Sequence, residues 1–151
     1  MKKQLGFTLI ELLVVIGIIS ALATVVFVAL DPATRFKSAR NARRVTDADT
    51  ILAAVQQYVV DTGGSLPTGM VGTTIYQIGS CASGGATNCP GAHTACIDIG
   101  ATLSSNKYLK NNPIDPNGSA ASTGYSITKD ANNLFTVNAC LSEGTTVAVS
   151  R

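Results

Sequence analysis

The chain opens with a long apolar stretch in which charge is almost absent. Residues 7–30 contain a single charged residue, Glu11, and at about 1.5 Å per residue a helix of this length reaches ~36 Å. That is enough to cross the ~30 Å hydrocarbon core of a membrane. Gly17 is a weak point within this helix, and Pro32, just after Asp31, removes a helix hydrogen bond. We therefore expect a membrane-length helix with breaks at Gly17 and Pro32.

A second helical pattern follows from Ala33 to Asp61, with apolar residues on one face only. The apolar residues recur at three- and four-residue steps: Val45, Ala48, Leu52, Val55 and Val59, with Ile51 and Tyr58 beside them. Gly63 and Gly64 then end the helix. Because an amphipathic helix buries its apolar face against another layer, this half is expected to lie against a small folded domain.

The rest of the chain is loop-rich and then alternates between apolar and polar residues, which is typical of strands. Residues 125–128 and 134–138 alternate at period two, turn residues 130–133 lie between them, and 145–149 offers a third strand. Residues 79–95 are rich in glycine and small residues and predict a loop. The predicted fold class is α+β: a long N-terminal helix, half membrane-spanning and half amphipathic, packed on a small C-terminal antiparallel β-sheet. The expected division is a short N-terminal segment at 1–6, a transmembrane helix at 7–30, an amphipathic half at 31–62 and a head at 63–151.

The charge distribution restricts the possible functions and contains one basic cluster that could form a binding surface. The net charge is +2, from 11 basic and 9 acidic residues, and residues 1–6 hold Lys2 and Lys3, so the remainder has nine of each. A neutral remainder argues against electrostatic binding of nucleic acid as the main role and suits a chain that packs against copies of itself. The densest basic cluster is Arg35, Lys37, Arg40, Arg43 and Arg44. It would serve DNA capture, or form a solvated helix face paired with Asp31, Asp47, Asp49 or acids of a neighbouring subunit; we favour the solvated face.

The four cysteines, Cys81, Cys89, Cys96 and Cys140, all lie beyond the membrane segment. An even number in a small exported domain predicts two disulfides, and four cysteines allow three pairings. We favour Cys81–Cys89, which closes the glycine-rich loop, and Cys96–Cys140, which ties that loop to the end of a strand. A zinc site is disfavoured because no CxxC occurs and His93 is the only histidine.

Other candidate chemistry is sparse, and no metal or cofactor is expected. Asp115 and Asn117 could join a calcium site, but turn chemistry explains them more simply. Asn117-Gly118-Ser119 fits a glycosylation sequon. His93 is interpreted as a loop residue, and no nucleophile–base pair, phosphate loop or carboxylate dyad stands out. We therefore assign no catalytic residues and do not expect an enzyme.

The N-terminal run GFTLIELLVVIGIISALATV, preceded by Lys2 and Lys3, resembles the start of type IV pilin superfamily subunits, which include pseudopilins of type II secretion and competence machines. The resemblance implies cleavage after Gly6 by a membrane prepilin peptidase, N-methylation of Phe7, and polymerisation into a helical filament by pilus assembly machinery. It also implies residence in the cytoplasmic membrane before assembly and an extracellular filament afterwards. Residues 1–6 would then be a leader peptide, residues 7–30 the filament-core helix and residues 63–151 a disulfide-containing head. DNA or surface ligands are candidate external partners, and adhesion and motility are candidate roles.

The motif has a physical logic of its own. Cleavage leaves a positive amine on Phe7, and Phe7 and Glu11 are spaced i and i+4, so both are expected on one helix face. The Glu11 carboxylate can meet the Phe7 amine of a neighbouring subunit, where low dielectric favours the pair over either charge alone. Such a pair would fix the axial register of one helix against the next.

Three alternatives compete with an extracellular pilus. Ala21-Leu22-Ala23 resembles an ordinary signal peptidase site, which would leave a soluble exported binding domain starting near Thr24. A permanent single-pass anchor is another. Within the resembled superfamily, a pseudopilin is the third; its major subunits usually carry Tyr-Pro-Thr after the helix and lack paired cysteines. This chain has Leu66-Pro67-Thr68 and four cysteines, which favours the pilus.

Overall fold

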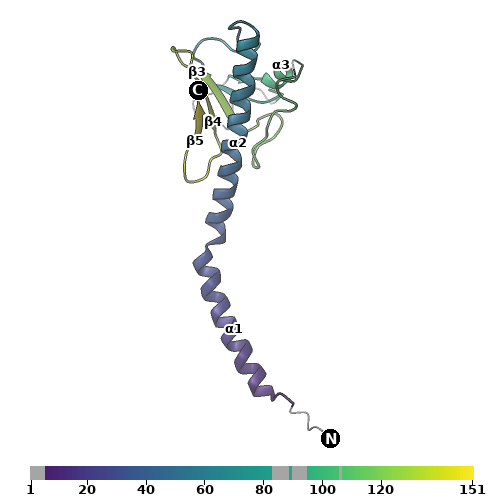
Figure 1. Ribbon diagram of the computed structural model, residues 1–151, viewed down its shortest axis with the longest axis vertical. Helices are drawn as coiled ribbons and strands as arrows, with labels where there is room; N and C mark the ends of the chain where they lie inside the picture. Colours follow the sequence, from purple (N-terminus) through teal and green to yellow (C-terminus); the bar gives the residue numbers. More distant parts are fainter. Residues whose placement is uncertain (1–5, 83–88, 90–94, 106) are drawn as a thin grey trace. The chain divides into compact units, whose positions relative to one another are not determined.

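In the computed structural model of this chain, the described residues are 6–82, 89, 95–105 and 107–151 (Figure 1). The chain divides into two compact units, Met1–Phe36 and Lys37–Arg151. The fold class is α+β, with a long N-terminal helical region and a small five-stranded sheet. Helix α1 belongs to the first unit, and α2 begins in the first unit and continues in the second. All strands of the described residues belong to the second unit.

The break predicted at Pro32 is confirmed. Helix α1 spans Leu9–Leu30 and is capped by Asp31, whose backbone is left-handed at φ 37°. Helix α2 starts directly afterwards and spans Pro32–Asp61. Proline has no N–H for the carbonyl four residues earlier, so the Val28 oxygen accepts instead from the Asp31 N–H at 3.4 Å.

The break predicted at Gly17 is wrong, because α1 runs through it without interruption. A glycine inside a helix costs about 1 kcal/mol relative to alanine, which is too little to end a long helix on its own. The hydroxyls nearby bond back to carbonyls of α1 itself. Ser20 donates to the Ile16 carbonyl at 2.7 Å and Thr24 to the Ser20 carbonyl at 2.9 Å, so neither hydroxyl needs a partner outside α1.

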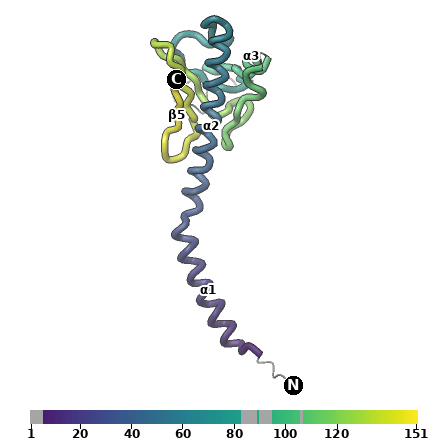
Figure 2. The backbone as a smooth tube through the Cα atoms, in the orientation of Figure 1, coloured from purple at the N-terminus to yellow at the C-terminus, as the bar shows by residue number. Residues whose placement is uncertain are grey.

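In the second unit, α2 supplies one side of the core and the sheet supplies the other (Figures 1 and 2). The predicted stripe is largely confirmed: Ala48, Leu52 and Val55 are buried, and Val59 packs partly against the same cluster. Val45 departs from the prediction and is 43% exposed, while Arg44 beside it is fully buried. The buried face of α2 therefore begins at Arg44 instead of Val45, and its later positions are largely those that the pattern predicts.

The sheet has the strand order β2-β1-β3-β4-β5. The three predicted strands exist, as β3 Tyr125–Lys129, β4 Phe135–Ala139 and β5 Val147–Ser150, and they pair antiparallel. Two further strands, β1 Tyr76–Ile78 and β2 Cys96–Ile97, were not predicted. They pair parallel with each other, so the sheet is mixed and the expectation of a purely antiparallel sheet is wrong.

The short elements escaped prediction because they are too short to show a period. Strand β1 has three residues and β2 has two, and the helix α3 that follows, Ile99–Ser105, has seven. Most of the predicted loop 79–95, with His93, lies outside the described residues. At its edges the chain is held by β1 and β2, which therefore position the cysteines on either side.

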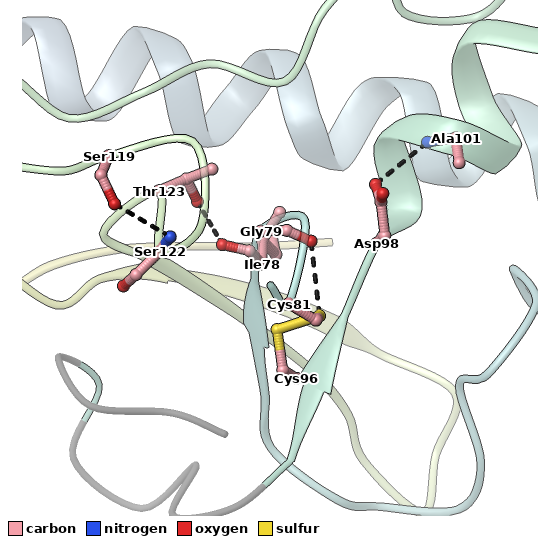
Figure 3. Close-up of a disulfide and its surroundings, with 9 residues drawn as sticks. All are labelled: Ile78, Gly79, Cys81, Cys96, Asp98, Ala101, Ser119, Ser122 and Thr123. Carbon is pink, nitrogen blue, oxygen red and sulfur yellow. Dashed lines mark hydrogen bonds between the residues drawn. A yellow bond between two sulfur atoms is a disulfide. The ribbon is translucent and has the colours of Figure 1, made fainter. Parts of the chain in front are cut away.

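The two predicted disulfides are present, but the predicted pairing is wrong. The bridges are Cys81–Cys96 and Cys89–Cys140, with Cα atoms 5.7 Å and 4.8 Å apart. The parallel pairing of β1 with β2 sets Gln77 opposite Cys96, and the left-handed backbone at Cys81, with φ 58°, turns the chain back toward it (Figure 3). The favoured Cys81–Cys89 and Cys96–Cys140 pairs assumed a loop closed on itself, whereas a strand pair that the sequence did not reveal brings Cys81 to Cys96.

Candidate processing and assembly site

The predicted cleavage bond lies in an exposed segment that precedes α1. Gly6, Phe7 and Thr8 are outside the helix, and the Phe7 side chain is 83% exposed. No described atom lies within 4 Å of where a Cβ at Gly6 would be. Exposed, non-helical backbone is what a peptidase needs in order to bind both sides of a bond, so the Gly6–Phe7 bond is accessible.

Thr8 and Glu11 form a capping box at the start of α1. The Glu11 Oε2 atom accepts from the Thr8 backbone N–H at 2.9 Å and from its hydroxyl at 2.7 Å. The Glu11 N–H in turn donates to the Thr8 hydroxyl at 3.3 Å. A carboxylate in the first turn is also favoured by the positive end of the helix dipole. The Glu11 carboxylate therefore has a structural role within its own chain, and its other oxygen, Oε1, lies outside the box.

Phe7 and Glu11 are not on one helix face in the manner predicted, because the helix begins two residues after Phe7. They nevertheless line the same shallow apolar groove, together with Ile10, Val14 and Val15. Phe7, which would carry the new amine after cleavage, and Glu11, which could accept from such an amine, thus border one surface. That surface is apolar apart from Glu11.

Helix α1 has no buried residue at all. Its apolar side chains point outward all round, from Leu9 at 81% exposed to Leu30 at 55%. The helical region that begins at Leu9 includes an 18-residue stretch with a mean hydropathy of 2.9, so its length and composition suffice to cross a membrane. A cleavable export signal has the same length and composition. Glu11 distinguishes a helix that assembles with others from such a signal, because a charge in an apolar segment is costly unless it has a function.

The basic cluster of α2 does not form one surface. Arg43 pairs with Asp47 at 3.5 Å, as a solvated helix face predicts. Arg40 and Arg44 instead reach acids of the head: Arg40 meets Glu143 at 2.6 Å, and Arg44 meets Asp115 at 2.5 Å. The hypothesis of a single solvated face is therefore wrong for these two arginines.

Arg44 of α2 and Asp115 of the head form an ion pair in which both side chains are fully buried. Arg44 Nε and the Nη2 atom bind separate oxygens of Asp115, at 2.5 Å and 3.0 Å. The hydrogen bond to Asp115 raises the pKa of Arg44. A two-pronged guanidinium–carboxylate pair fixes direction as well as distance, so it locks α2 against the loop that carries Asp115.

Glu143 extends this network to the loop between β4 and β5. Its carboxylate accepts from Arg40 Nε and Nη2, and the pKa of Glu143 is lowered, mainly by those hydrogen bonds. Its backbone is held as well: the Asn41 side chain accepts from the Glu143 N–H at 3.1 Å and donates to the Glu143 carbonyl at 2.8 Å. Residues 40–44 of α2 thus bind both the loop that carries Asp115 and the loop that carries Glu143.

The Asp115 carboxylate binds Arg44 and also accepts a hydrogen bond within its own turn. Besides Arg44, its Oδ1 atom accepts from the Asn117 backbone N–H at 2.8 Å. Among the described residues no group of three or more potential metal-binding side chains comes together. The sequence did hold a signal for the ion pair: Arg44 is four residues before Ala48, on the apolar stripe, and a charge on a buried face needs a partner.

Comparison with known proteins bears on the N-terminal segment. Residues 1–27 match the family model of the prokaryotic N-terminal methylation motif, which is the processing motif of prepilins and pseudopilins. No curated protein and no solved structure gives a significant match to this chain. The chain therefore carries the signature of a pilin-like or pseudopilin precursor.

Proposed function

We propose that this chain is a structural subunit of a type IV pilus-like extracellular filament, cleaved after Gly6 and polymerised through its N-terminal helix. The observation that carries the proposal is the combination, in one segment, of the methylation motif and a helix with no buried residue. A helix that is apolar all round needs either lipid or other helices around it. A filament supplies the second environment and a membrane the first.

The driving force for assembly would come from Glu11 rather than from the apolar residues. Lipid tails are as apolar as leucine, so moving α1 from a membrane into a helix bundle brings little hydrophobic gain. A carboxylate near the end of a membrane helix is costly, and its cost falls when a cation from a neighbour comes close. The amine created at Phe7 is such a cation, and Glu11 Oε1 is the oxygen that the capping box does not use.

The capping box adds a second effect of cleavage. Thr8 would become the second residue of the mature chain, and its N–H and hydroxyl already hold the Glu11 carboxylate. Glu11 would thus be fixed in direction before any neighbour arrives. Fewer side-chain rotamers then remain to be ordered on assembly, which lowers the entropic cost of the contact.

Processing and assembly would need partners in the cytoplasmic membrane. A prepilin peptidase would cut and methylate the precursor in the cytoplasmic membrane, and pilus assembly machinery would polymerise it. The mature subunits would reside in that membrane and then in an extracellular filament. The division of labour would follow the sequence, with residues 7–30 forming the filament core and residues 63–151 the displayed head.

Two disulfides favour a pilus over a pseudopilin, because they strengthen a head that is displayed outside the cell. Both bridges lie in the second unit and join segments 15 and 51 residues apart. In the chain-entropy model, loops of these lengths contribute roughly 3 and 4 kcal/mol. That is a large share of the roughly 5–15 kcal/mol by which a typical domain is stable.

Intact mass and N-terminal sequencing of the protein from cells that express prepilin peptidase would test the proposal. A methylated Phe7 at the N-terminus is expected. An N-terminus near Thr24 would contradict it and favour a soluble exported domain, and an uncut chain would favour a permanent anchor. The matched control is Gly6→Val: a branched side chain beside the cut bond should block the peptidase and leave Lys2 and Lys3 attached.

A further inference from the structure

The face of the sheet that points away from α2 carries small uncharged polar residues. Side chains alternate between the two faces of a strand. Tyr125, Ile127 and Val137 belong to the core that α2 completes. Ser126 lies between Tyr125 and Ile127, and Asn138 follows Val137, so both side chains point to the opposite face. They are direct partners in the β3–β4 register.

Two rows of this outer face differ in how their polar groups are used. In one row the hydroxyls are occupied: Thr136 and Ser150 bond each other at 2.8 Å, and Thr128 donates to the Thr73 carbonyl at 3.3 Å. In the next row the Ser126 hydroxyl and the Asn138 amide make no hydrogen bond to any described residue. The same outer face thus holds hydroxyls that are bonded to one another or to the backbone and, beside them, two polar side chains, those of Ser126 and Asn138, that are not bonded to described residues.

Ser126 and Asn138 line a groove. Two more hydroxyls, those of Ser142 and Thr146 on the loop between β4 and β5, line the same groove, and Ile75 supplies an apolar wall. Neither hydroxyl is bonded to any described residue. Ser126 is only 3% exposed and lines the groove. Among the described side-chain atoms, Asn112 Oδ1 is the one that is fully buried without a hydrogen bond, so the Ser126 hydroxyl is reached from the groove. A nearly buried polar group without a partner is uncommon, and it marks a position where a ligand's polar group gains most.

We propose that this groove is a binding site for a neutral saccharide. No charged side chain is among the described residues that line it, so an ionic ligand would lose its hydration there without compensation. Three hydroxyls and one amide can each donate and accept, which matches the hydroxyls of a sugar, since these also do both. The groove lies on the face of the sheet rather than on an edge strand, so it offers no row of backbone groups to an extended peptide.

The site is independent of the proposed filament. All its described residues belong to the second unit, and none is in the N-terminal helix. Failure of Phe7 processing would therefore leave sugar binding unchanged, and loss of sugar binding would leave assembly unchanged. No aromatic side chain is among the described lining residues, so the expected affinity is weak, with Kd on the order of 1 mM.

Binding can be tested on the full chain in lauryldimethylamine oxide micelles, whose head group carries no sugar. Saturation-transfer difference NMR with lactose, cellobiose and chitobiose should give a saturable signal for at least one of them. Sialylated and sulfated lactose should bind more weakly than lactose itself. Ser126→Ala, which removes one buried hydroxyl, and Asn138→Ala should each weaken the binding by about tenfold or more.

The matched control is Thr128→Ala. Thr128 is on the same strand and the same face as Ser126, two residues away, but its hydroxyl is occupied and it does not line the groove. It should bind as the unaltered chain does, and near-ultraviolet circular dichroism should show all three variants folded. The proposal is overturned if no neutral sugar gives a saturable signal, if the charged sugars bind more tightly, or if folded Ser126→Ala and Asn138→Ala bind unchanged.

Discussion

Replacing Arg44 with methionine should destabilise the head far more than the same replacement at Arg43. Arg44 and Asp115 are both fully buried, so removing the guanidinium leaves a buried carboxylate without its partner. Breaking a buried pair in this way costs about 3–5 kcal/mol. Methionine keeps the length and apolar stem of arginine, so lost packing contributes little to that figure.

Arg43 is the natural control because it is the next residue on the same helix. Its side chain is 61% exposed and its partner Asp47 is 3.5 Å away. An exposed pair of this kind is worth about 0–1 kcal/mol. The two methionine variants should therefore differ by several kcal/mol, against a total stability of roughly 5–15 kcal/mol for a typical domain.

The assay is urea unfolding of the full chain in micelles, followed by tyrosine fluorescence. The chain has no tryptophan, and its four tyrosines, Tyr58, Tyr76, Tyr108 and Tyr125, all lie in the second unit, so the signal reports on that unit alone. A double-mutant cycle with Asp115→Asn measures the charge-dependent part of the pair, because asparagine keeps the oxygen that accepts from Asn117 and replaces the one that accepts from Arg44 Nε. We expect a coupling energy of about 1–3 kcal/mol. Equal losses for Arg44→Met and Arg43→Met, or no coupling, would refute the reasoning.

Three further predictions concern assembly, the disulfides and pH. Glu11→Ala should leave cleavage intact but sharply reduce filament yield in electron micrographs, because the Phe7 amine loses its acceptor; a normal yield would disprove the pairing. Cys140→Ser opens a longer loop than Cys96→Ser and should cost about 1 kcal/mol more in urea unfolding; non-reduced peptide mapping that joins Cys96 to Cys140 would contradict the connectivity. Glu143 has a pKa lowered by Arg40, so its contribution is present above its ordinary value of 4.5 and is lost as pH falls through the lower folded value. The urea midpoint should thus fall more steeply on acidification in the unaltered chain than in Glu143→Gln, and parallel pH profiles would exclude this role.

The long elements could be predicted because each repeats one physical signal many times. In α1 nearly every position is apolar and Glu11 is its one charged residue, so the helix and its lack of buried residues follow from composition. The break at Pro32 follows from a missing N–H, which is a property of a single residue. Strands β3 and β4 alternate over five residues each, enough for the period to stand out. The processing motif is likewise local, and residues 1–27 contain all of it.

What the sequence left open depends on residues far apart in the chain. The pairing of Cys81 with Cys96 requires β1 to lie beside β2, and strands of three and two residues carry no readable period. Arg44 and Asp115 are 71 residues apart, and their burial follows from where α2 meets the loops of the head. The groove around Ser126 exists because the β3–β4 register sets it opposite Asn138.

The sequence by itself therefore determined the N-terminal helix, its break, the amphipathic half and the processing motif. The tertiary structure alone decided which charges are buried, which cysteines join and which polar groups stay free. The physical reason is the range of the interactions: helix formation, capping and apolar patterning act over a few residues, whereas ion pairs, disulfides and grooves need the packed sheet to bring distant residues together.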